Sequence, residues 1–237
     1  MKKILVLSLL LLSLMVNAQK QKVLNYQAVD DEKLHFGFSI GLNWMDMNIS
    51  RNALTLGNTL NDTLPYPDVN KIESGFNVNI VSELRLSEDF TLRFLPGLVF
   101  GQRTLNFFDH DEEEIASSQL ESNYLDFPLL VKYRAKRLNN YRPYLLAGTS
   151  VRYDMAAKKE FDDNSDDLLR LKKLDYFLEL GFGIDYYLPY FKFSTELKLS
   201  LGMRDVMVHE GAPGNTRYAS AIDKMTSKLI ILNFHFE

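Results

Sequence analysis

The chain has 237 residues, no cysteine and a formal net charge of −4 at pH 7. The lack of cysteine excludes disulfide bonds and thiolate metal sites, and the mild acidity argues against a nucleic-acid partner. A chain of this length is expected to form one domain, and its recurring alternation of apolar and polar residues favours the all-β class.

Residues 1–18 have the layout of a secretory signal peptide. Two lysines precede an apolar run, and the small residue Ala18 follows it. The run is shorter than the about 20 apolar residues that a transmembrane helix needs, so the pattern predicts a signal peptide cleaved between Ala18 and Gln19. Residues 19–32 are then a polar lead-in segment on the periplasmic side of the folded domain, which we expect at residues 33–237.

Eight segments of this domain alternate apolar and polar side chains with the period of two that is typical of β-strands. One face of each segment is apolar, and the other mixes glycine, serine and charges of both signs. In chain order the segments are residues 34–44, 75–86, 90–103, 124–134, 142–154, 174–187, 191–202 and 228–237.

Such alternation fits either a soluble barrel or sandwich with its apolar face inside, or a membrane barrel with its apolar face on lipid. Small residues and opposed charges on the polar face suit a narrow interior that side chains must fill. The apolar face carries no charge in mid-segment, where Lys or Arg would cost about 2–4 kcal/mol in lipid. Aromatic residues such as Trp44, Tyr133 and Tyr186 gather at segment ends, as interfacial girdles do. The sequence therefore predicts an eight-stranded antiparallel transmembrane β-barrel of the outer-membrane type.

The connections between segments alternate in length. Outer-membrane barrels have short periplasmic turns and long external loops, so we expect both termini in the periplasm of a Gram-negative cell. The short connections are residues 87–89, 135–140 and 188–190, and the long ones are approximately 45–71, 104–121, 155–173 and 204–226.

The last segment ends in alternating large apolar residues. Its outward face consists of Ile230, Leu232, Phe234 and Phe236, which we expect to contact lipid while the strand closes the barrel against the first one. A terminal aromatic strand is similar to the insertion signal that outer-membrane proteins present to the barrel-assembly machinery. Glu237 departs from that pattern because it follows the last phenylalanine.

The inward face carries many charges of both signs. One interpretation is a selective channel or ion relay, and the other is a packed network of ion pairs that stabilises the barrel. We favour the network because eight strands leave little room for a pore. Its expected members are Glu83, Arg85, Arg93, Arg103, Asp126, Lys132, Arg134, Arg142, Arg152, Asp175, Glu179, Asp185, Lys192, Glu196 and Lys198.

Candidate metal and catalytic groups are few. The acidic run 109–114 could bind a cation but is more typical of a solvated loop, and residues 162–167 lack the glycine and glutamate of a calcium loop. No GxSxG motif is present. A lipid-modifying barrel enzyme would have His110 and His209 as its outward candidates. We expect no catalytic residue, metal or cofactor.

The segments YLDFPLLVKYR (124–134) and YRPYLLAGTSVRYDM (141–155), with the NAQ sequence at the cleavage site, resemble the PorT family of outer-membrane barrels of Bacteroidota. The resemblance covers the mature chain, and its motifs are shared by many related barrels of these bacteria. It implies a part in type IX protein secretion and gliding, with other components of that apparatus as partners. An accessory or assembly role is expected, because an eight-stranded interior cannot pass a folded cargo. A barrel that binds a small ligand or passes small solutes is the alternative.

Overall fold

The structure is a computed structural model, and it describes residues 23–26, 32–51, 66–108, 113–157, 170–208 and 221–237. The predicted signal peptide and its cleavage site at Ala18 and Gln19 lie outside these residues. Among the residues described, no helix is long and apolar enough to cross a membrane.

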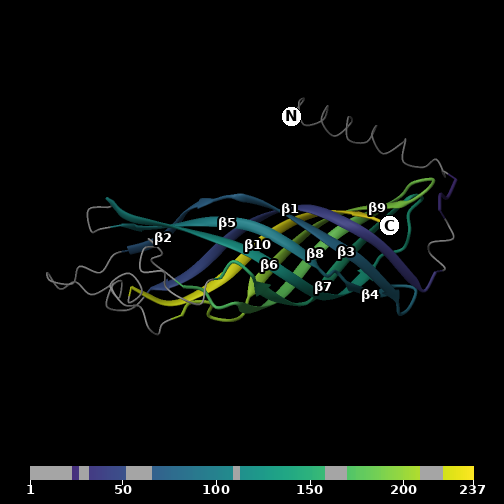
Figure 1. The fold of residues 1–237 in the computed structure, drawn as a ribbon. Helices are drawn as coiled ribbons and strands as arrows, with labels where there is room; N and C mark the ends of the chain where they lie inside the picture. Colours follow the sequence, from purple (N-terminus) through teal and green to yellow (C-terminus); the bar gives the residue numbers. More distant parts are fainter. Residues whose placement is uncertain (1–22, 27–31, 52–65, 109–112, 158–169, 209–220) are drawn as a thin grey trace, which may run out of the picture.

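The described chain forms one antiparallel sheet that curls into a barrel (Figure 1). The ends of the barrel differ, because three short turns lie at one end, which we call the short-turn end. The strands are β1 (Leu34–Arg51), β2 (Tyr66–Ile72), β3 (Ser74–Arg85), β4 (Phe90–Phe94), β5 (Gly97–Phe108), β6 (Glu114–Arg134), β7 (Tyr141–Asp154), β8 (Leu174–Tyr187), β9 (Lys192–Gly202) and β10 (Ile222–Phe236).

The ring is closed by β1, which pairs with β10 on one side and with β3 on the other. The pairs β2–β3 and β4–β5 each act as one barrel strand, since β2 and β3 follow one another along β5, and β4 and β5 follow one another along β6. Pro96, which has no N–H to donate, lies in the break between β4 and β5. The ten segments therefore make an eight-stranded ring, which confirms the predicted fold.

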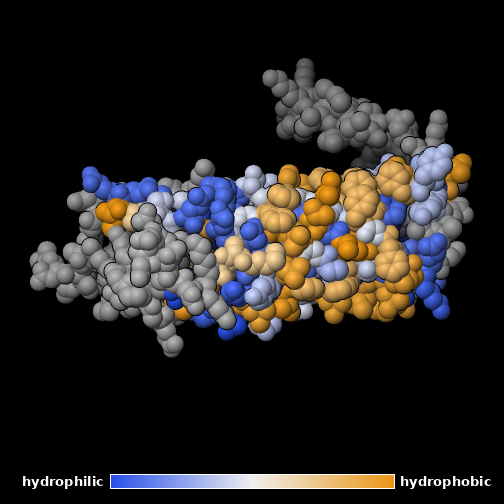
Figure 2. Space-filling view, in the orientation of Figure 1, coloured by the Kyte–Doolittle hydropathy of each residue, from blue (hydrophilic) through white to orange (hydrophobic). Residues whose placement is uncertain are grey.

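Over most of the barrel the usual polarity of a globular protein is inverted. Phe36, Ile80 and Phe182 point outward and are 65%, 61% and 57% exposed, whereas Arg93 and Lys132 point inward and are fully buried. Figure 2 shows the outward apolar side chains as a broad band over the visible face of the short-turn half of the barrel. On β1 this band runs from Leu34 to Trp44, a span that suits the about 9–11 residues of a tilted transmembrane strand.

Beyond this band the strands continue where the sequence predicted loops. β1 extends to Arg51, β5 to Phe108, β6 begins at Glu114 and β10 at Ile222. The predicted loops 45–71, 104–121 and 204–226 are therefore too long, and residues 109–113 alone connect β5 to β6. We call this part the loop-end extension; it consists of residues 45–51, 66–72, 103–108, 114–123 and 222–228.

The loop-end extension has the polarity of a soluble protein. Asp46 and Asn48 of β1 face outward, while Met47 faces inward and is 6% exposed. Most inward side chains of this part form an apolar core, and this change of polarity explains why the outward apolar pattern ended before the strands did. The core consists of Met47, Leu105, Phe107, Leu120, Val206, Met207, Ile222 and Met225.

At the opposite end, part of the lead-in segment is bound to the short turns. Asn25 donates its backbone N–H to Oδ1 of Asn140 at 2.9 Å and its side-chain amide to the carbonyl of Tyr187 at 3.2 Å. Arg137 donates to the carbonyl of Asn25, and its guanidinium lies 3.6 Å from the centre of the Tyr187 ring. We call these contacts the lead-in clasp; they hold the N-terminal segment against the turn that joins β6 to β7.

Candidate functional site

The charged side chains of the interior gather in two groups. The first charge cluster lies toward the short-turn end, and the second lies farther along the axis. The first consists of Glu83, Arg93, Lys132, Asp185, Lys192, Glu196, His235 and Glu237, and the second of Asp126, Arg152, Glu179 and Lys198.

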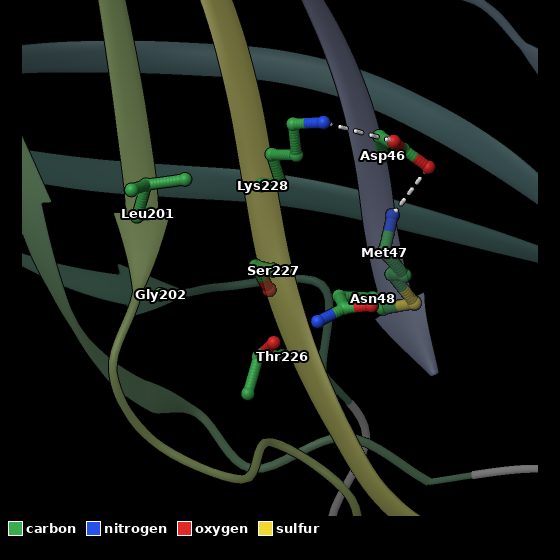
Figure 3. A pocket seen from close by; sticks show the side chains of 8 residues that line it. All are labelled: Asp46, Met47, Asn48, Leu201, Gly202, Thr226, Ser227 and Lys228. Atoms are coloured by element: carbon green, nitrogen blue, oxygen red, sulfur yellow. Dashed lines mark hydrogen bonds and ion pairs between the residues drawn. The ribbon is translucent and has the colours of Figure 1, made fainter. Parts of the chain in front are cut away.

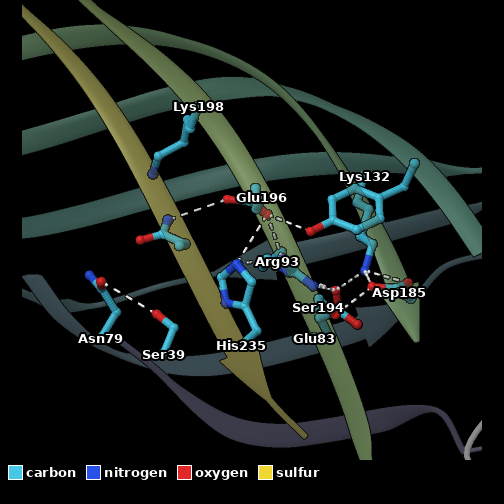
Figure 4. Close-up of polar contacts among 12 residues, drawn as sticks. Ser39, Asn79, Glu83, Arg93, Lys132, Asp185, Ser194, Glu196, Lys198 and His235 are labelled. Atoms are coloured by element: carbon cyan, nitrogen blue, oxygen red, sulfur yellow. Dashed lines mark hydrogen bonds and ion pairs between the residues drawn. The ribbon is translucent and has the colours of Figure 1, made fainter. Parts of the chain in front are cut away.

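Arg93 of β4 is the centre of the first charge cluster (Figure 4). Its guanidinium contacts Glu83 of β3 at 2.5 Å, Glu196 of β9 at 2.8 Å and Glu237 at 3.2 Å. All of these side chains are fully buried. A planar guanidinium with five N–H donors can hold several carboxylates at once, so one residue ties three strands together across the interior.

Two lysines complete this cluster. Lys132 lies 3.2 Å from Glu83 and 3.0 Å from Asp185, and its ammonium lies 3.9 Å from the centre of the Tyr144 ring. Lys192 contacts Glu83 at 3.2 Å and Glu237 at 2.7 Å. Buried charges must be paired to be tolerated, and here Arg93, Lys132 and Lys192 each contact at least two carboxylates.

The second charge cluster is smaller and balanced in charge. Arg152 of β7 contacts Asp126 at 3.0 Å and Glu179 at 2.6 Å. Lys198 of β9 contacts Glu179 at 2.7 Å. The hydroxyl of Ser200 donates to Glu179 at 2.8 Å, so these contacts link the neighbouring strands β6, β7, β8 and β9 along the inner wall.

Amides fill the interior beside β1, β3 and β10. Asn77 donates to Oδ1 of Asn79 and to Oδ1 of Asn233, each at 2.8 Å. Gly41 of β1 leaves the room for them, because a Cβ there would lie 2.3 Å from Oδ1 of Asn233 and 2.7 Å from Oδ1 of Asn77. Glycine is thus required at this position of the polar face, because a side chain there would collide with the neighbouring amides.

Some predicted members of the network lie elsewhere. Arg134 and Arg142 are buried, but they donate to the backbone carbonyl of Glu88 at 3.1 and 3.0 Å and so fasten a short turn. Arg85 is only half-buried at the same rim, where its Nε donates to the carbonyl of Ser87 at 3.4 Å. Alternation predicts which face a residue takes, but not that a strand-end side chain prefers a nearby carbonyl.

Arg103 and Asp175 also lie in the interior but outside both clusters. Arg103 donates through Nη2 to the hydroxyls of Ser122 and Tyr124 at 3.0 and 3.2 Å. Its Nε and Nη1 have no hydrogen-bond acceptor among the residues that the structure describes. Asp175, at the start of β8, is 2% exposed.

Three members of the first charge cluster or its surroundings were missing from the predicted network. Tyr144 donates its hydroxyl to Glu196 at 2.9 Å, and Nε2 of His235 lies 3.2 Å from the same carboxylate. Glu237, which departed from the expected terminal pattern, shares the parity of His235, and its side chain points into the first charge cluster. His235 and Glu237 alternate with the outward residues of the last strand, so the alternation alone was sufficient to predict that these two side chains face the interior.

The last strand has its aromatic residues on the outer face. Ile230 is 42% exposed, and Leu232, Phe234 and Phe236 are half-buried against neighbouring strands. Phe236 stacks on Phe38 of β1 with ring centres 5.0 Å apart. Such cross-strand aromatic pairs stabilise the seam where the ring closes.

The charged groups of the two clusters are held in ion pairs with one another. Among the described residues, no group of three or more His, Asp or Glu side chains is placed to hold a metal ion. The candidate histidines His110 and His209 and the acidic run 162–167 lie outside the described residues, as does most of the run 109–114.

A family model described as the outer membrane protein beta-barrel domain matches residues 17–208. The chain therefore belongs to this family of outer-membrane barrels, and the family assigns it to the Gram-negative outer membrane. A search of curated proteins returned no match.

Solved structures of small outer-membrane barrels are similar to this chain. Neisserial surface protein A is 12% identical with a TM-score of 0.45, and the match covers 86% of this chain and 98% of that one. OprG from Pseudomonas aeruginosa is 12% identical with a TM-score of 0.39, over 86% and 91% of the two chains. Ail of Yersinia pestis, in complex with the heparin analogue sucrose octasulfate, is 11% identical with a TM-score of 0.39, over 86% and 99%.

Proposed function

We propose that this chain is a non-enzymatic, non-conducting outer-membrane barrel that serves type IX protein secretion as an accessory or assembly component. The proposal that the barrel does not conduct rests on its filled interior. Arg93, Lys132 and Arg152 are fully buried; the ion pair of Arg93 with Glu196 crosses the interior from β4 to β9, and the pairs of Arg152 lie along the inner wall of β6, β7 and β8. An interior packed in this way leaves no path for a folded cargo.

The proposed role in type IX secretion rests on the resemblance of residues 124–134 and 141–155 to the PorT family. In this proposal the short-turn end faces the periplasm, together with both termini and the lead-in clasp, and the loop-end extension faces outside. The barrel-assembly machinery inserts the chain through its last strand. Other type IX components contact the surfaces at the two ends, since a closed interior leaves only outer surfaces for partners.

Deletion of the gene tests the secretion role. We expect type IX cargo to disappear from the medium and to accumulate in the periplasm, and a plasmid-borne copy to restore export. The abundance of an unrelated outer-membrane barrel, measured in the same cells, controls for general membrane damage. Unchanged cargo export would remove the secretion role while leaving the barrel architecture intact.

A second candidate function is the binding and passage of small polar solutes through the interior. It is favoured by Arg103, whose Nε and Nη1 lack acceptors among the described residues, so an anion or water would suit them. Swelling of proteoliposomes in solutes of graded size tests it. Swelling that Arg103→Leu abolishes would support this function over the first, and the absence of swelling would remove it.

The proposal that the barrel is not an enzyme has its own test. We expect the membrane-lipid mass spectra of cells that carry the double variant His110→Ala, His209→Ala to match the wild type. Loss of a modified lipid in that strain would contradict it.

A further inference from the structure

A hollow of about 470 Å³ lies in the outer wall where β1, β9 and β10 meet. Its lining includes Asp46 and Asn48 of β1, Leu201 of β9, and Thr226 and Lys228 of β10. Figure 3 shows Lys228 extending from β10 toward Asp46, with Leu201 on the other side of β10. The hollow therefore combines charged, polar and apolar groups from three neighbouring strands.

The hollow lies at the edge of the outward apolar band. Trp44 of β1 pairs with Ile230 of β10, and two residues farther along Asp46 pairs with Lys228. Lys228 in turn pairs with Leu201, a lipid-facing residue of β9. The change from apolar to charged side chains takes place between these two rows, so the hollow lies at the level of lipid headgroups.

Its two charges form a loose pair. Nζ of Lys228 lies 3.9 Å from Oδ2 of Asp46, and their side chains are 44% and 31% exposed. Oδ1 of Asp46 accepts the backbone N–H of Met47 at 2.8 Å, which fixes the direction of the carboxylate. A partly exposed pair at this distance contributes little stability and can exchange its partner for charges of a ligand at small cost.

We propose that this hollow binds the headgroup of a membrane lipid that carries phosphoethanolamine. The phosphate lies against the ammonium of Lys228 and the hydroxyl of Thr226. The ammonium of the ligand donates to the carboxylate of Asp46 and the amide oxygen of Asn48, and Leu201 contacts the start of the acyl chain. The inference depends on the barrel being in a membrane and not on a role in secretion.

The charge pattern distinguishes this headgroup from others. A purely anionic headgroup would place its phosphate beside the carboxylate of Asp46, and the two negative charges would repel each other. A choline headgroup carries the same charges but no N–H, so it cannot donate a hydrogen bond to Asp46 or Asn48. A headgroup with one phosphate and one N–H cation complements both charged members of the hollow.

Trp44 provides the probe, since it is the single tryptophan of the chain and lies next to the hollow on the same face. The refolded protein is placed in bilayers of phosphatidylcholine that contain increasing fractions of a brominated lipid, and the quenching of Trp44 fluorescence gives its relative binding constant. We expect brominated phosphatidylethanolamine to bind about threefold more tightly than brominated phosphatidylcholine. Equal binding of the two, or stronger binding of brominated phosphatidylglycerol than of phosphatidylethanolamine, would overturn the proposal.

Matched variants identify the groups responsible. Lys228→Ala and Asp46→Ala should each reduce the preference for phosphatidylethanolamine to near unity, and Lys228→Arg should retain it. Lys224→Ala is the control, because Lys224 is a lysine of the same strand and pairs with Ser50, outside the hollow. A preference that survives Lys228→Ala, or that Lys224→Ala removes equally, would place the recognition elsewhere.

Discussion

The membrane-spanning part of this barrel and its loop-end extension use the same strands with opposite polarity. On β1, residues 34–44 place apolar side chains outside, and Asp46 and Asn48 of the same outer face are polar. The inner face changes in step, from Ser39 and Asn43 to Met45 and Met47. The backbone continues through this change without interruption, which teaches that the surrounding solvent, and not the strand, decides which face is apolar.

The two regions consequently differ in the polar content of their interiors. The interior of the membrane-spanning part contains ion pairs and amides, each of which requires its partner, beside smaller apolar clusters such as Val81, Leu130 and Leu146. The interior of the loop-end extension contains Met47, Phe107 and other apolar residues that pack by the hydrophobic effect. Substitutions in the two regions should therefore destabilise the protein in different ways.

The largest effect is expected from Arg93→Leu. This change leaves Glu83, Glu196 and Glu237 without their shared guanidinium, and breaking a buried ion pair costs about 3–5 kcal/mol. The free energy of unfolding, measured by urea titration of the refolded barrel in detergent or lipid, should fall by that amount. Arg85→Leu at the rim is the matched control, with an expected loss below about 1 kcal/mol; similar losses for both variants would refute the central position of Arg93.

Phe107→Ala should affect the loop-end extension alone. Phe107 is fully buried in the apolar core, and truncation of such a residue costs about 3 kcal/mol or more. The extension should become sensitive to protease while the gel shift between unheated and boiled samples is retained, because the first charge cluster is intact. Simultaneous loss of the gel shift would show that the two regions unfold as one.

Gly41→Ala is expected to destabilise the membrane-spanning part moderately. Its Cβ would collide with the amides of Asn77 and Asn233, and overpacking of this kind costs about 1–3 kcal/mol. The double variant Gly41→Ala, Asn233→Ala should recover part of the loss, as a urea titration of both would measure. An additive loss in the double variant would mean that the glycine matters for another reason.

The smallest effect is expected from Arg137→Ala in the lead-in clasp. This change removes the hydrogen bond to Asn25 and the contact with the Tyr187 ring, which together are worth about 1–2 kcal/mol at this half-buried position. Protease should cleave the lead-in segment several-fold faster while the barrel keeps its stability. Unchanged cleavage would show that the segment is held by other contacts.

Most of the fold could be predicted from the sequence because period-two alternation is a local property. It located the eight barrel strands and the faces of residues such as Glu83, Lys132 and Glu196. It also placed Phe234 and Phe236 on the outer face of the last strand.

The remaining features depend on contacts that alternation does not encode. The sequence predicted strand ends near Trp44 and Arg103 because the outward apolar alternation stops there, where the polarity of the two faces reverses. Tyr144 and His235 gain their partners from strands far away in the sequence. The binding of Arg134 and Arg142 to the carbonyl of Glu88 depends on the shape of a turn.

If ion pairs close the interior, the barrel passes no ions, and conductance across a planar lipid bilayer tests this most directly. The purified wild-type barrel should produce no discrete current steps above those of protein-free bilayers. The variant Arg93→Ala, Arg152→Ala, which removes the central side chain of each charge cluster, should produce steps if it folds. Discrete steps from the wild-type barrel would contradict a closed interior and favour a channel for small solutes.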